Sequence, residues 1–343
     1  MSELGVGGIS GTYLHSARNL RERPCPATAK APGRLATGVF ALAIASCGLG
    51  CDREKPPQPP EVVASALNAS PKLGDFVLEA QNSIRLQTGG LVVNGGDVGA
   101  RGTGSGPFLS GGVAVDVLTG AQIQTTRNVI ADSVRLGTGV KAGDIQTNRF
   151  VDGVGATHGS ISGLVSLPAL PAVCGASPGT SNLTVGTGAT VTASPGQFAA
   201  VSVGTGGKLR LNSGRYDVSN VTVGTGARIE ALGSVQIRVA NRMSTSSGSF
   251  IGAASGTTLS ARDLRIEISG QNGTTGALGA TPPAASLGTG NVVTALILVP
   301  NGTLVMGTGI TATGAFMARD IDVGGAGARI VFQDGFVGCT AAS

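Results

Sequence analysis

The sequence has few of the residues that carry most protein chemistry. It contains no tryptophan and only two histidines; aromatic residues make up 3% of its 343 residues, and charged residues 13%, against about 25% in an average domain. A disordered chain combines high charge with low hydrophobicity, whereas the mean hydropathy here is positive, at +0.26. The composition therefore excludes disorder and favours architecture over catalysis.

Glycine, by contrast, is abundant. There are 57 glycines, which is far above the usual share of roughly 7%. They do not recur at every third position, which excludes a collagen triple helix. Each glycine inside a helix costs about 1 kcal/mol relative to alanine, so a helical bundle is disfavoured. The composition predicts an all-β fold built from small residues and many turns.

The net charge of +5 does not indicate a nucleic-acid partner. Residues 1–46 hold five basic and two acidic groups, so the other residues carry 19 basic and 17 acidic groups, a net charge of +2. No stripe of Lys and Arg interleaved with aromatics follows, as nucleic-acid binding would favour. We therefore expect no nucleic-acid partner.

Residues 1–46 have the pattern of an export signal. A basic, irregular segment precedes the uncharged run 35–46, which is too short to span a bilayer but suits a signal peptide. The run ends in Ile44-Ala45-Ser46-Cys47, which resembles the bacterial lipobox and implies that Cys47 is lipidated. An ordinary cleaved signal is the alternative. The resemblance, with Gly48 after the cysteine, implies the outer membrane of a Gram-negative bacterium, on its periplasmic or its surface-exposed side. The Pro-rich segment 47–61 predicts a stiff tether.

The remaining chain contains a repeat. The tripeptide Gly-Thr-Gly occurs seven times, and where the repeat is clearest its spacing is 18–20 residues. The units 181–198 and 199–216 align without a gap. Apolar residues superpose and alternate with polar ones, which is the period of a β-strand. The superposed sets are Leu183, Val201 and Val221; Val185, Val203 and Val223; Val191, Leu209 and Ile229; and Phe198 with Tyr216.

One such unit cannot bury its apolar face alone, so we expect the units to stack. Short strands, tight turns and a constant period predict a single-chain parallel β-helix, a solenoid that we expect to be right-handed. Residues 181–339 would form its regular coils, and residues 62–165 an N-terminal cap with irregular coils. Within that range, 62–81 could form a capping helix. The segments 166–180 and 270–290 are expected to be a crossing loop and a second loop.

The repeats 181–336 also carry a resemblance. The units Val-Gly-Thr-Gly-Ala and Val-Gly-Thr-Gly-Gly, with the closing stretch that begins at Leu296, resemble an uncharacterised β-helix domain of bacterial exported and surface proteins. Some proteins with this domain are linked to pilus assembly, and its repeats are similar to those of the polymer-forming bactofilins. The resemblance implies a structural role and transfers no catalytic residue.

Few residues could support catalysis. Many β-helices act on acidic polysaccharides with clustered carboxylates and a basic residue. The candidates for such an alternative site are Asp144, Asp152, Lys141 and His158. No coil repeats a carboxylate at a matched position, and no second His or Cys stands at a zinc-ligand spacing. We therefore expect no enzyme, no cofactor and no metal, with a polysaccharide lyase or hydrolase as the alternative.

The cysteines and the export signal together suggest the remaining features. Export makes a disulfide plausible, and Cys174 with Cys339 is the expected pair, although a plain solenoid would hold them roughly 40 Å apart at the usual strand spacing. The pairing therefore requires the crossing loop or the C-terminal tail to run back along the body. The expected partners are a membrane through the lipid anchor, and cell-surface polysaccharide, protein or further copies of the chain.

Overall fold

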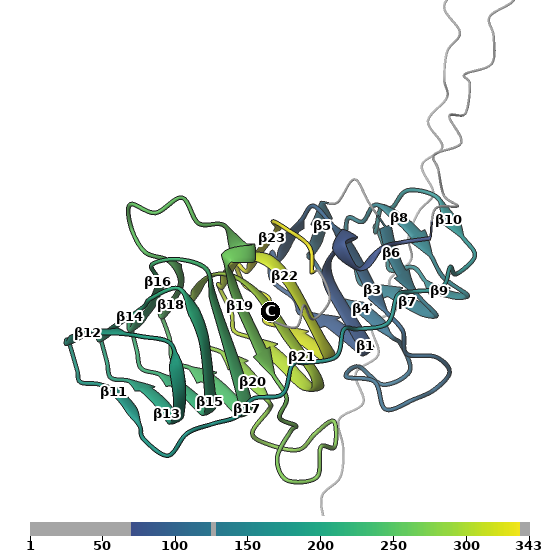
Figure 1. The fold of residues 1–343 in the computed structure, drawn as a ribbon. Helices are drawn as coiled ribbons and strands as arrows, with labels where there is room; N and C mark the ends of the chain where they lie inside the picture. The colour runs from purple at the N-terminus through teal and green to yellow at the C-terminus, as the bar shows by residue number, and fades with distance from the viewer. Residues whose placement is uncertain (1–69, 125–127, 337–343) are drawn as a thin grey trace, which may run out of the picture. The chain divides into compact units, whose positions relative to one another are not determined.

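The computed structural model describes residues 70–124 and 128–336, which all belong to one compact unit spanning 64–343 (Figure 1). These residues form β-strands, two short 3-10 helices and no α-helix. The prediction of an all-β chain is therefore confirmed. No helical segment in the described ranges has the length and apolar character needed to cross a bilayer.

The strands are β1 (Phe76–Leu86), β2 (Val92–Asn94), β3 (Asp97–Ala100), β4 (Val115–Val117), β5 (Gln122–Gln124), β6 (Asn128–Ala131), β7 (Ser133–Leu136), β8 (Asp144–Gln146), β9 (Arg149–Val151), β10 (Ile161–Ser162), β11 (Leu183–Val185), β12 (Thr190–Ala193), β13 (Gly196–Val203), β14 (Lys208–Leu211), β15 (Gly214–Val223), β16 (Arg228–Ala231), β17 (Val235–Thr245), β18 (Phe250–Ala253), β19 (Leu264–Ile268), β20 (Ala285–Leu287), β21 (Val292–Met306), β22 (Thr311–Val323) and β23 (Arg329–Phe332). The 3-10 helices are η1 (Leu73–Asp75) and η2 (Ala261–Asp263).

Strands of successive repeats pair in parallel and in the register that the sequence predicts. Leu183 pairs with Val201, which pairs in turn with Val221. The second strand of each repeat also pairs with the second strand of the next repeat: β12 pairs with β14, and β14 pairs with β16. Val201, Val221 and most apolar side chains at these positions are buried in one continuous core, against which the partly buried Leu183 packs.

One predicted superposition is wrong. Phe198 pairs with Val218, while Tyr216 lies opposite Gly196. The coil that ends at Tyr216 is two residues longer than a gapless alignment assumes, and the additional residues lie in the turn before β15. The Tyr216 hydroxyl lies within hydrogen-bond distance of two backbone carbonyls across this turn, those of Ala193 (2.9 Å) and Asn212 (3.0 Å), which share its one proton.

In the Gly-Thr-Gly turn 204–206 the two glycines are required for different reasons. The second adopts a positive φ, 64° at Gly206, which side chains with a Cβ rarely accept. The first lies against the turn of the preceding coil: a Cβ on Gly204 would come within 2.9 Å of the Thr187 nitrogen. Neighbouring turns are also hydrogen-bonded, since Gly206 donates to the carbonyl of Thr225. The turns therefore stack as closely as the strands.

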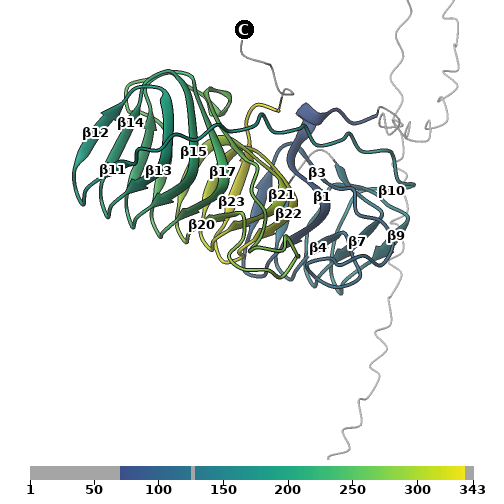
Figure 2. The ribbon, with the colours of Figure 1, turned by 60° about the horizontal axis from the view of Figure 1, so that its bottom comes forward.

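The coils do not stack in sequence order. Strand β1 pairs with β22 on one side and with β3 and β4 on the other, so the last coils of the chain lie against the first. From β1 the coils proceed to β9 and β10. Residues 163–182, which contain no strand, then cross to β11, from where the coils return to β23 (Figures 1 and 2). We call residues 163–182 the crossing segment, and the β1–β22 contact the seam.

The crossing segment covers a second, smaller apolar cluster outside the main core. Outward-facing side chains of several strands, including Phe76, Ile130 and Met317, are buried beneath it. The segment contributes Leu164, Val165, Leu167, Leu170 and Val173 to this cluster. Its three prolines suit a path without strand pairing, because proline removes a backbone donor. The crossing segment therefore packs along the coils without forming strand.

Two expectations for irregular segments need correction. Residues 76–81, expected within a capping helix, are strand, and η1 is the only helical turn in the described part of that region. The reason is that β1 lies inside the sheet with a neighbour on each side, so it needs no cap. The second loop is shorter than expected: it spans 269–284, and 285–287 form β20, which pairs with β17 and β21.

Candidate functional site

The residues of the alternative enzyme site all lie in the last two coils before the crossing segment. Asp144 begins β8, and its Oδ1 accepts hydrogen bonds from the backbone nitrogen (2.8 Å) and hydroxyl (2.9 Å) of Ser160. Nε2 of His158 lies 3.8 Å from Oδ2 of Asp152. Lys141 forms backbone bridges to the neighbouring coils. Asp144 thus organises a turn, while Asp152 and His158 form a separate pair.

These residues do not converge on one point. Among the described residues, no hydrogen bond or ion pair joins Lys141 to Asp144 or Asp152, and the His158 ring packs edge-on against Phe150 at 5.1 Å. The described ranges also contain no group of three or more His, Cys, Asp or Glu residues that could hold a metal ion. The contacts of these residues are therefore local: Asp144 stabilises a turn, and His158 packs against Phe150.

Several other carboxylates are held in a ladder of alternating charge that crosses the seam. Arg85 on β1 lies between Asp322 on β22 and Asp116 on β4, and Arg135 on β7 follows. Arg85 forms an ion pair with Asp322, and Arg135 binds both oxygens of Asp116, at 2.7 and 2.6 Å. Opposite charges side by side on neighbouring strands stabilise one register. This ladder is structural and fixes the seam.

Three hollows lie along one corner of the coils, where the strands of each coil bend. The first is about 460 Å³ in volume and lies between the loops 101–114 and 269–284. The second, of about 520 Å³, lies on the other side of the loop 269–284. The third, of about 210 Å³, lies where the crossing segment leaves the last coils. Ligand sites in proteins commonly have volumes of about 300–1,000 Å³, so the first two are the candidate sites.

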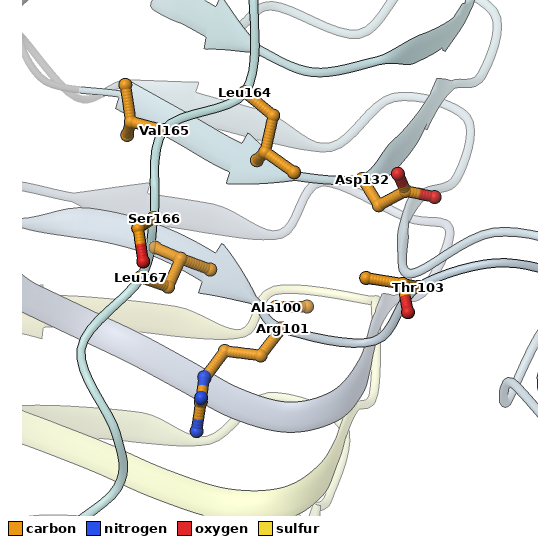
Figure 3. Close-up of a pocket in the computed structure, with 8 residues that line it drawn as sticks. All are labelled: Ala100, Arg101, Thr103, Asp132, Leu164, Val165, Ser166 and Leu167. Carbon is orange, nitrogen blue, oxygen red and sulfur yellow. The ribbon is translucent and has the colours of Figure 1, made fainter.

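The third hollow is lined by charged residues of the corner and by the start of the crossing segment (Figure 3). Asp132 accepts hydrogen bonds from Asn148 (2.9 Å) and Arg149 (2.9 Å), which lower the pKa of its carboxyl. The Arg101 side chain points away from Asp132 and passes Leu167. In this hollow the Asp132 carboxylate is therefore paired with Arg149 and not with Arg101.

Glu79 is the unusual titratable group of this region. It lies on β1, opposite Met317 and Gly99, and is fully buried. Within the described ranges neither carboxyl oxygen has a hydrogen-bond partner. Burial raises the pKa of Glu79 to about 8, and the positive charge of Arg101 only partly opposes this rise. At neutral pH Glu79 is therefore held mainly as a neutral acid.

No known relative adds to this geometry. No family model matches the chain, and no curated protein and no solved structure matches it. Only the residues that line the corner hollows therefore indicate what these hollows could bind.

Cys174 also holds the crossing segment in place. This cysteine is disulfide-bonded, and its backbone nitrogen donates a hydrogen bond of 2.8 Å to the buried carboxylate of Glu267. The other cysteines of the chain, Cys47 and Cys339 among them, lie outside the described residues. Pairing of Cys174 with Cys339 stays a prediction, but the path of the crossing segment meets the geometric requirement set by the sequence.

The residues that line the first two corner hollows were missed by sequence reasoning. Gln81, Asn82, Asn301 and Arg319 lie at strand bends, where the alternation of polar and apolar residues is interrupted. The alternation signal disappears at such bends. The one available signal was the clustering of Asn, Gly and Pro at these bends.

Proposed function

We propose that the chain is an exported, non-catalytic lipoprotein whose body is a structural, adhesive or scaffold element of the cell envelope. Its N-terminal segment is an export signal that ends at Cys47, and the lipid on Cys47 anchors the protein to the outer membrane of a Gram-negative bacterium. Its body is a right-handed, single-chain parallel β-helix. It belongs to the β-helix domains of bacterial surface proteins that the repeats resemble.

The in-register stacking of coils carries this proposal. Parallel pairs join β11 through β23 to β1 and onwards to β10, so that one core and one set of stacked turns run through all coils. Such an assembly resists deformation because every strand inside it is paired on both sides. The chain enters the sheet at β1, which has a paired neighbour on each side. The coils at the two ends of the body therefore do not carry the connection to the N-terminal segment.

The state of Cys47 tests the anchor. We would express the full chain and its Cys47→Ala variant in a Gram-negative host and measure the mass of the N-terminal peptide of the membrane-extracted protein. A lipidated Cys47 at the mature N-terminus is expected, and Cys47→Ala should lose the lipid and leave the membrane fraction. Cys51→Ala is the matched control and should keep both. Lipid retained on the Cys47→Ala variant, or a mature wild-type chain without lipid, would refute the anchor.

A second function, end-to-end self-assembly like that of bactofilins, is favoured by the coil that contains β9 and β10. This coil exposes three large apolar side chains, Val151 (52%), Val154 (83%) and Ile161 (49%), which are three of the five such residues in the described part of the chain. It also ends the strand order, so its outer edge is unpaired. Concentration-dependent filaments that Val154→Asp abolishes would support this function, and a monomer at every concentration would exclude it.

Action on polysaccharide is the remaining alternative. As an enzyme it would depend on Asp144, Asp152, Lys141 and His158, which would have to move together on binding. Release of reducing or unsaturated ends from an acidic polysaccharide, lost in Asp144→Asn, would establish it. Without such products, polysaccharide remains a possible binding partner only.

A further inference from the structure

We propose that the cleft between the loops 101–114 and 269–284 binds a neutral, hydroxyl-rich glycan chain. This site is distinct from the residues considered for catalysis and does not depend on the lipid anchor.

Both loops leave the coils at the same corner. The loop 101–114 follows β3, the loop 269–284 follows β19, and both project from the lower side of the body in Figure 1. Between them in the strand order lie the bends of β21, β22 and β1. Four strand steps of about 4.8 Å place the bases of the loops about 19 Å apart. The loops are therefore the two walls of a cleft whose floor is the strand bends.

Each wall is fixed by one inserted side chain. Phe108, in the first loop, is buried in the main core, and the neighbouring Pro107 carbonyl accepts a hydrogen bond of 3.1 Å from Asn82. In the second loop the buried Asn272 amide donates to the Thr303 hydroxyl (2.8 Å), and its oxygen accepts from the Ala284 nitrogen (3.1 Å). The cleft is thus formed before any ligand enters, which lowers the entropy lost on binding.

The floor is polar but carries no free carboxylate. Asp320 is fully buried and accepts hydrogen bonds from Asn82 (2.6 Å), Ser83 (2.7 Å) and Arg319 (2.8 Å). Arg319 also donates to the Gly276 carbonyl at 2.5 Å. Its charge and that of Asp320 compensate each other, so the floor of the first hollow carries no net charge.

Hydrogen-bonding capacity remains on this floor. Nη2 of Arg319 is buried without a partner, and the exposed amide of Gln81 has none among the described residues. A buried N–H without a partner is unfavourable, and a ligand hydroxyl could accept its hydrogen bond. The walls add apolar surface from Pro107 and Leu278. Polar planar groups below and apolar surface at the sides match a sugar ring, which has hydroxyls at its edge and C–H groups on its faces.

The second hollow extends the site. It is lined by side-chain amides and a guanidinium, from Asn220, Asn241, Arg242, Gln271 and Asn301. Its Asn301 lies next to the first hollow, because the Asn301 carbonyl oxygen is 3.4 Å from Nη1 of Arg319. From the bend of β15 to that of β1 there are five strand steps, or about 24 Å. That length suits an oligosaccharide lying across the loop 269–284 better than a single sugar.

Calorimetric titration of the full chain with linear hexasaccharides of glucose and of N-acetylglucosamine tests the proposal. We expect saturable binding of at least one of them and weaker binding of its monosaccharide. Gln81→Ala and Asn241→Ala should each weaken binding about threefold to tenfold, the effect of one lost hydrogen bond. Ala277→Trp, which fills the first hollow from an exposed position, should abolish binding.

The matched controls are Gln197→Ala and Asn212→Ala, which remove the same exposed side chains far from the cleft and should leave affinity unchanged. Binding of neither hexasaccharide overturns the proposal, as does binding that Ala277→Trp leaves intact. Tighter binding of a polygalacturonate hexasaccharide would contradict the neutral ligand. Since Cys47→Ala should bind like the wild type, failure of the anchor and failure of this site are distinguishable.

Discussion

Replacement of Glu79 by glutamine should make the protein more stable at alkaline pH. Glu79 is fully buried beneath the second apolar cluster, both its oxygens lack hydrogen-bond partners, and its pKa is raised to about 8 from an ordinary value of 4.5. The cause is burial, which disfavours the charged form. Glutamine keeps the shape of the side chain and removes the charge that the folded state has to accept.

The sign and size of the effect follow from proton linkage. Between pH 4.5 and about 8 the unfolded chain has lost the proton from Glu79 while the folded chain keeps it, so stability falls as the pH rises through this range. The difference between the two pKa values corresponds to about 5 kcal/mol. Below pH 4.5 the variant should therefore gain little, at pH 7 about 3 kcal/mol, and above pH 8 about 5 kcal/mol.

Urea denaturation at pH 4.5, 7 and 8.5 measures this difference. Glu267→Gln is the matched control, because Glu267 is equally buried but accepts hydrogen bonds from Gln236 (2.9 Å) and Cys174 (2.8 Å). Its replacement should destabilise the protein at every pH. If wild type and Glu79→Gln lose stability in parallel between pH 4.5 and 8.5, Glu79 is ionised in the folded protein and the reasoning is refuted.

Three further changes test other parts of the fold. Phe108→Ala should lower the free energy of unfolding by about 3–5 kcal/mol, because the side chain fills the main core, and an unchanged urea midpoint would show that the loop is not anchored there. Cys174→Ser should cost about 2–4 kcal/mol, a difference that should vanish when wild type is measured under reducing conditions and that would contradict the account if it persisted. Tyr216→Phe should cost about 1 kcal/mol, since the hydroxyl has two carbonyl partners, and no loss in thermal denaturation would refute that role.

The repeat made the local structure predictable. Gly-Thr-Gly turns and alternating apolar residues give the strand rows of Leu183, Val185 and Val191 in their observed register. These features depend only on residues of one coil and of the next coil in the sequence, so they can be recognised in a single sequence. The misplacement of Tyr216 came from a coil two residues longer than its predecessor, a difference that a gapless alignment hides.

The order of the coils was not predictable in the same way. Parallel edges of similar coils are chemically alike, so the repeat does not indicate that β22 pairs with β1. Complementary charges such as Arg85 and Asp322 fix this contact, yet they are 237 residues apart in the sequence. The corner cleft was missed for the same reason, because its two loops become neighbours only through the seam.

The seam is the central claim, and the distance between residues 92 and 329, on the β2–β23 pair that continues the same contact, tests it most directly. Val92 and Arg329 are register partners of adjacent strands, about 4.8 Å apart, whereas a solenoid stacked in sequence order would separate them by more than about 50 Å. We would place nitroxide labels on Val92→Cys and Arg329→Cys in a Cys51→Ser chain and measure their dipolar coupling. A second pair, Val92→Cys with Thr190→Cys, lies seven strand steps apart, or about 34 Å. Strong short-range coupling for 92–329 and a long distance for 92–190 are predicted, and a long distance for 92–329 would contradict the account.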